Sequence, residues 1–299
     1  MRRLLWSLCT LCTLLLFSSC EKALLNVDQS DEDPDGNLTV SVYQIEKTPF
    51  GNLTRGADAS VTRAAKPASE VCTRLNFAIY TLEGTRVKQV NQVSTDANYG
   101  AATFQLEAGT YQLVVVGHSS GGNPTMTDPT CIKFTNAQGY TDTFIHSETI
   151  TIGEDPVEQP VVLHRITALC RFVLTDATIP ADVKTLRFYY TGGSGAFDAA
   201  TGLGSVNSKQ DVKFTVTADQ KQFDLYTYLH DTEGTIHLTV TALDANSNVL
   251  YERTFDVPMQ QNYITWVSGV FFNGSGTSTT TITGVTVNTD WAGETHITF

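Results

Sequence analysis

The chain has 299 residues, a formal net charge of −12, 41% hydrophobic residues and 17% charged residues. An acidic surface repels nucleic-acid phosphates, which argues against a nucleic-acid-binding protein. The length suits about two domains, and a composition with few charges but many Thr, Gly and Val favours β-sheets over long helices.

The first twenty residues predict an export signal. Two arginines precede an apolar run from Leu4 to Phe17, which is too short for a typical membrane span. Two serines then lead into Cys20, although Phe17 stands where strict lipoprotein signals carry leucine. We therefore expect residues 1–19 to be a lipoprotein signal peptide and Cys20 to carry the lipid. The alternative is an ordinary cleaved signal in which Cys20 has no role.

Residues 20–36 form a polar leader with a concentration of aspartate and glutamate. Such a segment is typical of a solvated tether between a lipid and a fold. The run Asp31–Gly36 also imitates the first half of a calcium-binding loop, but Val42 stands where that loop needs a bidentate glutamate. We expect an acidic tether and no metal site.

Short segments of alternating apolar and polar residues predict a first β-sandwich over residues 37–158. The expected strands are 38–43, 75–79, 87–93, 104–106, 111–115 and 150–152. A long polar loop from Pro49 to Pro67 interrupts them and carries Arg55 and Arg63, which would be accessible to a protease.

The second half repeats this pattern and predicts a second β-sandwich over residues 159–299. The expected strands are 161–163, 172–174, 186–190, 214–216, 223–225, 236–240, 249–255, 265–272 and 285–291. Turn-forming residues separate them, and no window has a sustained helical period. The sequence thus predicts an all-β chain of two tandem sandwiches that meet between Gly153 and Leu163.

Three cysteines remain after the signal and the lipidation site: Cys72, Cys131 and Cys170. An exported protein meets an oxidising compartment, so we expect one disulfide and one buried thiol. The sequence does not fix the pair. Cys72 with Cys131 is preferred because both fall in the first predicted domain.

The sequence shows no catalytic constellation. None of its six histidines lies in an HxH, HxxH or HExxH arrangement, and no GxSxG nucleophile turn occurs. We therefore expect no enzyme, no cofactor and no metal. Trp266 and Trp291 offer a stacking platform for sugars, although packing of large aromatic side chains is the favoured interpretation.

The C-terminal region predicts a strand that contacts a partner. A Gly/Ser/Thr-rich segment, 274–280, precedes apolar and β-branched residues that suit a strand. These are Ile282, Val285, Val287, Ile297 and Phe299. The alternative interpretation is that they form the last strands of the second sandwich.

Several segments together resemble the FimB/Mfa2 family of fimbrial anchor subunits from Bacteroidetes. They are Leu163–Thr175, Gly234–Asp244, Val249–Phe255, Val287–Trp291 and Ile297–Phe299. The resemblance covers essentially the whole mature chain. It implies two transthyretin-like β-sandwich domains and an N-terminal lipid in the outer membrane, with exposure on the cell surface.

The resemblance also implies a partner and a role. The protein would hold the base of a fimbria and limit its length by strand-mediated contact with a shaft subunit. In related shaft pilins, cleavage after an arginine removes the first strand, whereas an anchor should keep its N-terminus. Two alternatives remain: a surface glycan-binding lipoprotein, and a shaft or tip pilin of the same system.

Overall fold

The computed structural model describes residues 31–46, 67–135, 139–217, 220–272, 281–286 and 291–299. The described chain is almost entirely β, as predicted, and its one helix is the single turn α1, Ala68–Val71. No helix in these ranges has the length and apolarity needed to cross a membrane. Cys20, Arg55, Arg63 and Val287 lie outside the described residues.

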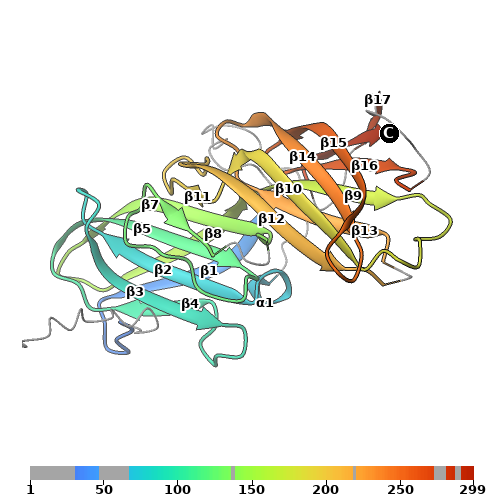
Figure 1. Cartoon of the computed structure of the whole chain (residues 1–299). Helices are drawn as coiled ribbons and strands as arrows, with labels where there is room; N and C mark the ends of the chain where they lie inside the picture. Colours follow the sequence, from blue (N-terminus) through green and yellow to red (C-terminus); the bar gives the residue numbers. More distant parts are fainter. Residues whose placement is uncertain (1–30, 47–66, 136–138, 218–219, 273–280, 287–290) are drawn as a thin grey trace, which may run out of the picture.

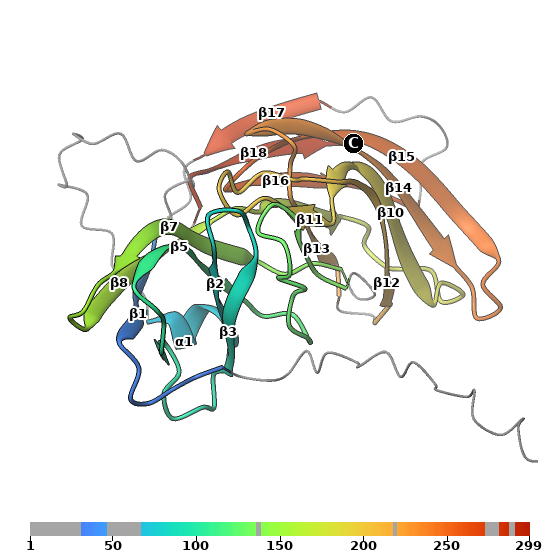
Figure 2. The ribbon, with the colours of Figure 1, turned by 90° about the vertical axis from the view of Figure 1, so that its left-hand side faces the viewer.

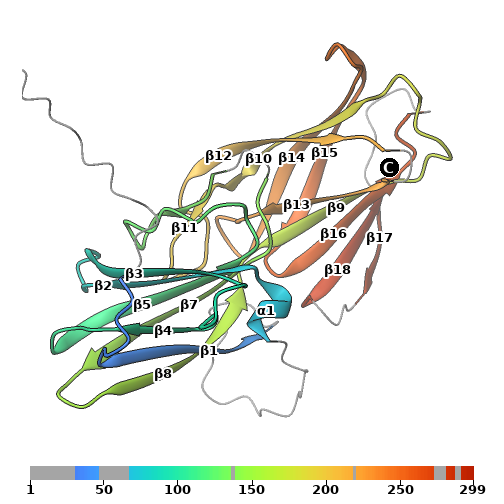
Figure 3. The ribbon, with the colours of Figure 1, turned by 90° about the horizontal axis from the view of Figure 1, so that it is seen from below.

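A seven-stranded sheet contains the first half of the chain, in the order β3-β2-β5-β7-β8-β1-β4 (Figure 1). Its strands are β1 (Leu38–Glu46), β2 (Arg74–Tyr80), β3 (Arg86–Val93), β4 (Ala101–Phe104), β5 (Gly109–His118), β7 (Thr143–Ile152) and β8 (Val157–Arg165). β7 and β8 pair only at Phe144↔Arg165 and Ile145↔His164. The sheet therefore folds over at this corner (Figure 3). One hydrophobic core collects side chains from all seven strands.

The end of the acidic leader is part of this sheet. The Asp31 amide donates to the Gln89 carbonyl at 2.8 Å, and the Gln89 amide donates to the Asp31 carboxylate at 3.0 Å. The Asp33 amide donates to the carbonyl of Thr103 on β4 at 3.0 Å. Residues 31–33 thus join the two edge strands, β3 and β4. The expectation of a solvated tether up to residue 36 is wrong for this stretch, because its backbone groups find partners on the sheet.

The second half is a sandwich of two sheets, of four strands (β12-β10-β14-β15) and of five (β13-β9-β16-β18-β17). The four-stranded sheet consists of β10 (Thr185–Ser194), β12 (Asn207–Thr215), β14 (Glu233–Leu243) and β15 (Val249–Gln260). The five-stranded sheet consists of β9 (Ala168–Leu174), β13 (Gln222–Thr227), β16 (Tyr263–Gly269), β17 (Thr281–Thr286) and β18 (Gly293–Thr298). Between them, Phe172 meets Phe188 and Phe255 at ring-centroid distances of 5.5 and 5.6 Å.

The change of sheet occurs between Arg165 and Ala168. β8 pairs with β1 along its length, so residues 159–165 lie in the first sheet although they follow the predicted boundary at residue 158. The division into two independently folding domains stays a prediction.

Buried side chains join the two halves, which lie in direct contact in Figure 2. Tyr80 and Val114, on the outer face of the first sheet, belong to one hydrophobic cluster with Phe134, Phe197 and Tyr228. A short ladder of β6 (Ile132–Lys133) with β11 (Ala196–Phe197) crosses the same region. Because the cluster takes side chains from both halves, separating the halves would expose it to solvent.

Arg165 forms a polar clamp at this junction and is only 6% exposed. Its Nε and Nη2 donate to the Asp142 carboxylate, each at 2.8 Å, and Nη1 donates to Asn262 Oδ1 at 3.0 Å. The guanidinium carbon also lies 3.9 Å from the ring centroid of Trp291. One side chain thus connects Asp142, before β7, to residues of the C-terminal sandwich.

The predicted disulfide between Cys72 and Cys131 is absent, because both residues are free thiols. Cys72 lies just before β2 and packs closely against Gly117, where an added Cβ would be 3.1 Å from its Sγ. Burial raises the pKa of its thiol. Cys131 follows Pro129, which packs near Gly84 in the turn beyond the other end of β2. A strand of seven residues spans about 20 Å, too far for a disulfide.

Candidate functional site

The C-terminal strand lies inside the protein's own sheet. β18 pairs with β16 on one side and β17 on the other. Ile297 is 1% exposed, and the Phe299 ring lies 5.4 Å from Phe172 and 4.8 Å from Phe255 between centroids. These contacts place Ile297 and Phe299 in the core. In this arrangement the Ile297 side chain is not available to a partner, and the partly exposed Phe299 ring packs against the core. Both contacts favour the alternative interpretation, in which this segment is a strand of the second sandwich.

β17 forms the edge of the five-stranded sheet and carries Ile282 and Val285 of the predicted partner strand. None of the described strands pairs with its outer side. Its sequence, TITGVT, contains neither a charge nor a proline, the residues that usually protect an edge from pairing. By contrast, the edge strand β12 exposes Lys209, Asp211 and Lys213. Among the described edges, β17 is therefore well suited to accept another strand.

The two tryptophans of the five-stranded sheet are packed against other side chains. Arg171 and His296 come from the strands on either side of Trp266 and lie 4.9 and 5.6 Å from its ring centroid. Trp291 is 6% exposed beneath Arg165. Neither ring offers an open face to a sugar, consistent with the favoured packing interpretation.

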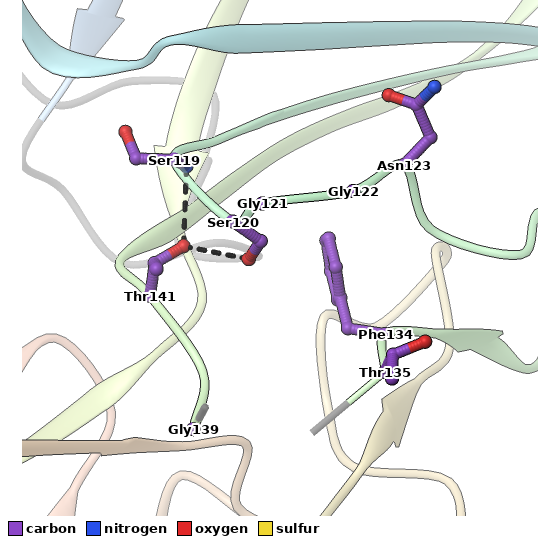
Figure 4. Close-up of a pocket in the computed structure, with 9 residues that line it drawn as sticks. All are labelled: Ser119, Ser120, Gly121, Gly122, Asn123, Phe134, Thr135, Gly139 and Thr141. Carbon is purple, nitrogen blue, oxygen red and sulfur yellow. Dashed lines mark hydrogen bonds between the residues drawn. The ribbon is translucent and has the colours of Figure 1, made fainter. Parts of the chain in front are cut away.

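A cavity of about 400 Å³ opens between the loop after β5 and the chain on either side of residues 136–138 (Figure 4). We call it the loop cavity. Its lining residues are Ser119, Ser120, Gly121, Gly122, Asn123, Phe134, Thr135, Gly139 and Thr141. The Thr141 hydroxyl accepts the Ser119 amide at 3.2 Å and lies 3.1 Å from the Ser120 hydroxyl.

A buried polar network supports this loop. His118 Nδ1 accepts the Ser120 amide at 3.0 Å, so Nε2 carries the proton and donates to Asn76 Oδ1 at 2.8 Å. Asn76 Nδ2 in turn donates to Asn123 Oδ1 at 3.1 Å and to Asn91 Oδ1 at 2.7 Å. Burial, with a smaller contribution from Arg74, lowers the pKa of His118 to about 3. The imidazole therefore stays neutral and holds the loop at physiological pH.

The described lining of this cavity consists of uncharged side chains and glycines, with no group that ionises in the physiological range. The described residues contain no group of three or more metal-ligating side chains. Sequence reasoning missed the cavity, since Ser119–Gly122 reads only as a glycine-containing connection. Its partners Asn76 and Thr141 are distant in sequence, and no local motif reveals them.

A protein-family model described as a family of unknown function (DUF6562) matches residues 35–298. The chain belongs to this family. No curated protein matches it. Membership of this family therefore implies no particular activity.

Solved structures with a similar arrangement include fimbrial and adhesin proteins. A protein assigned as an adhesin from Bacteroides ovatus is 12% identical, with a TM-score of 0.45 over 73% of this chain and 82% of that one. A fimbrial assembly protein from Parabacteroides distasonis is 14% identical, with a TM-score of 0.40 over 78% and 90%. The fimbrial anchor protein Mfa2 from Porphyromonas gingivalis is 11% identical, with a TM-score of 0.39 over 72% and 80%. These similarities are too distant to assign a role, so the role of the DUF6562 chain has to be argued from its own residues.

Proposed function

We propose that this DUF6562 protein is a lipid-anchored subunit that holds the base of a fimbria in the outer membrane. One observation supports the proposal most directly. Residues 31–33, at the end of the leader, bond to the edge strands β3 and β4 of the first sheet. The edge strand β17, which has no described partner on its outer side, lies in the C-terminal sandwich at the other end of the molecule (Figure 1). This layout separates a membrane attachment from a strand-pairing edge.

The same layout offers a physical means of limiting length. A filament grows when each subunit has two different interfaces, one for each neighbour. A subunit with lipid at one end and a pairing edge at the other has only one interface for a shaft subunit. The backbone of the partner strand would pair with the edge of β17, and growth would stop at the membrane.

Replacing Cys20 with alanine should move the protein from the membrane fraction to the soluble fraction, because the lipid would be its membrane attachment. Ser19→Ala is the matched control, since it keeps a small residue before the cysteine and should leave the protein in the membrane. Fractionation followed by immunoblotting measures both variants. A Cys20→Ala protein that stays in the membrane fraction would contradict lipid anchoring.

The surface form of the protein should begin at Cys20, because cleavage in the 49–67 loop would separate the fold from its lipid. Mass spectrometry of the protein released from cells should therefore find the acylated N-terminal peptide. The double variant Arg55→Gln/Arg63→Gln should have an unchanged N-terminus. A mature chain starting at Gly56 or Ala64 would instead indicate a shaft subunit.

A further inference from the structure

We propose that the loop cavity binds a neutral saccharide, an activity beyond the anchoring role and independent of it. The first argument is electrostatic. The nine described residues that line the cavity are uncharged, in a chain whose net charge is −12. Among the described lining residues there is no cation for an anion and no carboxylate for a cation, and the net charge of the protein repels anions. The nearby Arg74 guanidinium is engaged by the Asn123 side chain and the Gly121 carbonyl. The lining thus favours a neutral ligand.

The second argument is the mixture of groups in the lining. Serine and threonine hydroxyls can both donate and accept hydrogen bonds, and Asn123 adds an amide. Phe134 rises between the two segments (Figure 4), but its ring is 8% exposed and packs against His118 at a centroid distance of 4.7 Å, so only a small part of it is open to a ligand. Sugars are rich in hydroxyl groups, so the hydroxyl and amide groups of this lining match their surface. A volume of about 400 Å³ also lies within the usual range of small-molecule sites.

The third argument is that the loop is held in place before any ligand arrives. Ser120 and Asn123, on either side of the two glycines, are bonded to His118 and Asn76, and both of these residues are 0% exposed. Arg74 Nη1 also donates to Asn123 Oδ1 at 3.2 Å. A site fixed by buried groups loses less conformational entropy on binding than a loose one. An ordinary loop between two strands does not need this many buried hydrogen bonds.

Two glycines allow a sharp test. A Cβ added at Gly121 or Gly122 meets no atom within 4 Å, and neither residue has a left-handed φ. Gly122→Leu should therefore fold normally while placing an isobutyl group at the cavity. Gly153, in the turn between β7 and β8, has the same open surroundings and is remote in sequence, so Gly153→Leu is the matched control.

The experiment measures binding of glucose, galactose, mannose, N-acetylglucosamine and their disaccharides to the purified full-length chain by saturation-transfer NMR and calorimetry, with glucuronate as the anionic comparison. We expect at least one neutral sugar to bind, Gly122→Leu to weaken it by roughly tenfold or more, and Gly153→Leu to leave it unchanged. Gly121→Leu serves as the second variant if Gly122→Leu lowers the unfolding midpoint. Binding of no neutral sugar, equal binding by the cavity variants, or a preference for glucuronate would each overturn the proposal. Because membrane attachment plays no part in this assay, its failure is distinct from failure of the anchor role.

Discussion

Replacing Arg165 with methionine is expected to lower the free energy of unfolding by about 3–5 kcal/mol. The substitution removes the paired hydrogen bonds to Asp142, the bond to Asn262 and the cation–π contact with Trp291. It also leaves the Asp142 carboxylate, whose side chain is 24% exposed, without its counter-charge. Urea denaturation followed by circular dichroism and tryptophan fluorescence measures the change.

Arg187→Met is the matched control, because Arg187 forms the same two-pronged pair with Asp211 at the surface. Its side chain is 36% exposed and that of Asp211 is 40% exposed, so its loss should cost about 1 kcal/mol or less. Adding Asp142→Asn to Arg165→Met should restore part of the lost stability, since no unpaired charge then remains. Equal losses for the two arginine variants would show that Arg165 is not a clamp.

Deleting Gly293–Phe299 is expected to unfold the C-terminal sandwich. The deletion removes the strand between β16 and β17, leaves β17 without a neighbour, and empties the space filled by Ile297 and Phe299. Differential scanning calorimetry should show the main transition lost or greatly lowered. An unchanged melting temperature combined with lost fimbrial attachment would instead support the donor-strand interpretation.

A point substitution gives the same test on a finer scale. Ile297→Ala should cost about 2–5 kcal/mol, because it truncates a fully packed side chain. Thr298→Ala is the matched control, because the Thr298 side chain is exposed. This substitution should change the free energy of unfolding by about 0.5 kcal/mol or less. If the two variants have equal stability, the core role of Ile297 is wrong.

The β character of the chain was predictable from alternation because each strand has one face toward a core. Leu38 and Val40 show this directly: both are fully buried, and Thr39 between them is partly exposed. The order of the strands was not predictable. β1 pairs with β8, more than a hundred residues later, and such pairing depends on the whole fold rather than on any local pattern.

The functional residues were also predictable only in part. The apolar content of Ile297 and Phe299 fits a donor strand and a core strand equally well, and only their contacts with Phe172 and Phe255 decide between the two. The loop cavity is lined by three segments of the chain, residues 119–123, 134–135 and 139–141. Its serines and glycines alone have the composition of an ordinary turn.

The placement of the two terminal strands has a mechanical consequence. β1 lies between β8 and β4, and β18 lies between β16 and β17, so each is an inner strand. A tensile load applied along either strand would have to slide it past two neighbours at once. The hydrogen bonds on both sides would then share the force instead of opening one after another from a free edge. Both strands would therefore resist being pulled out of their sheets.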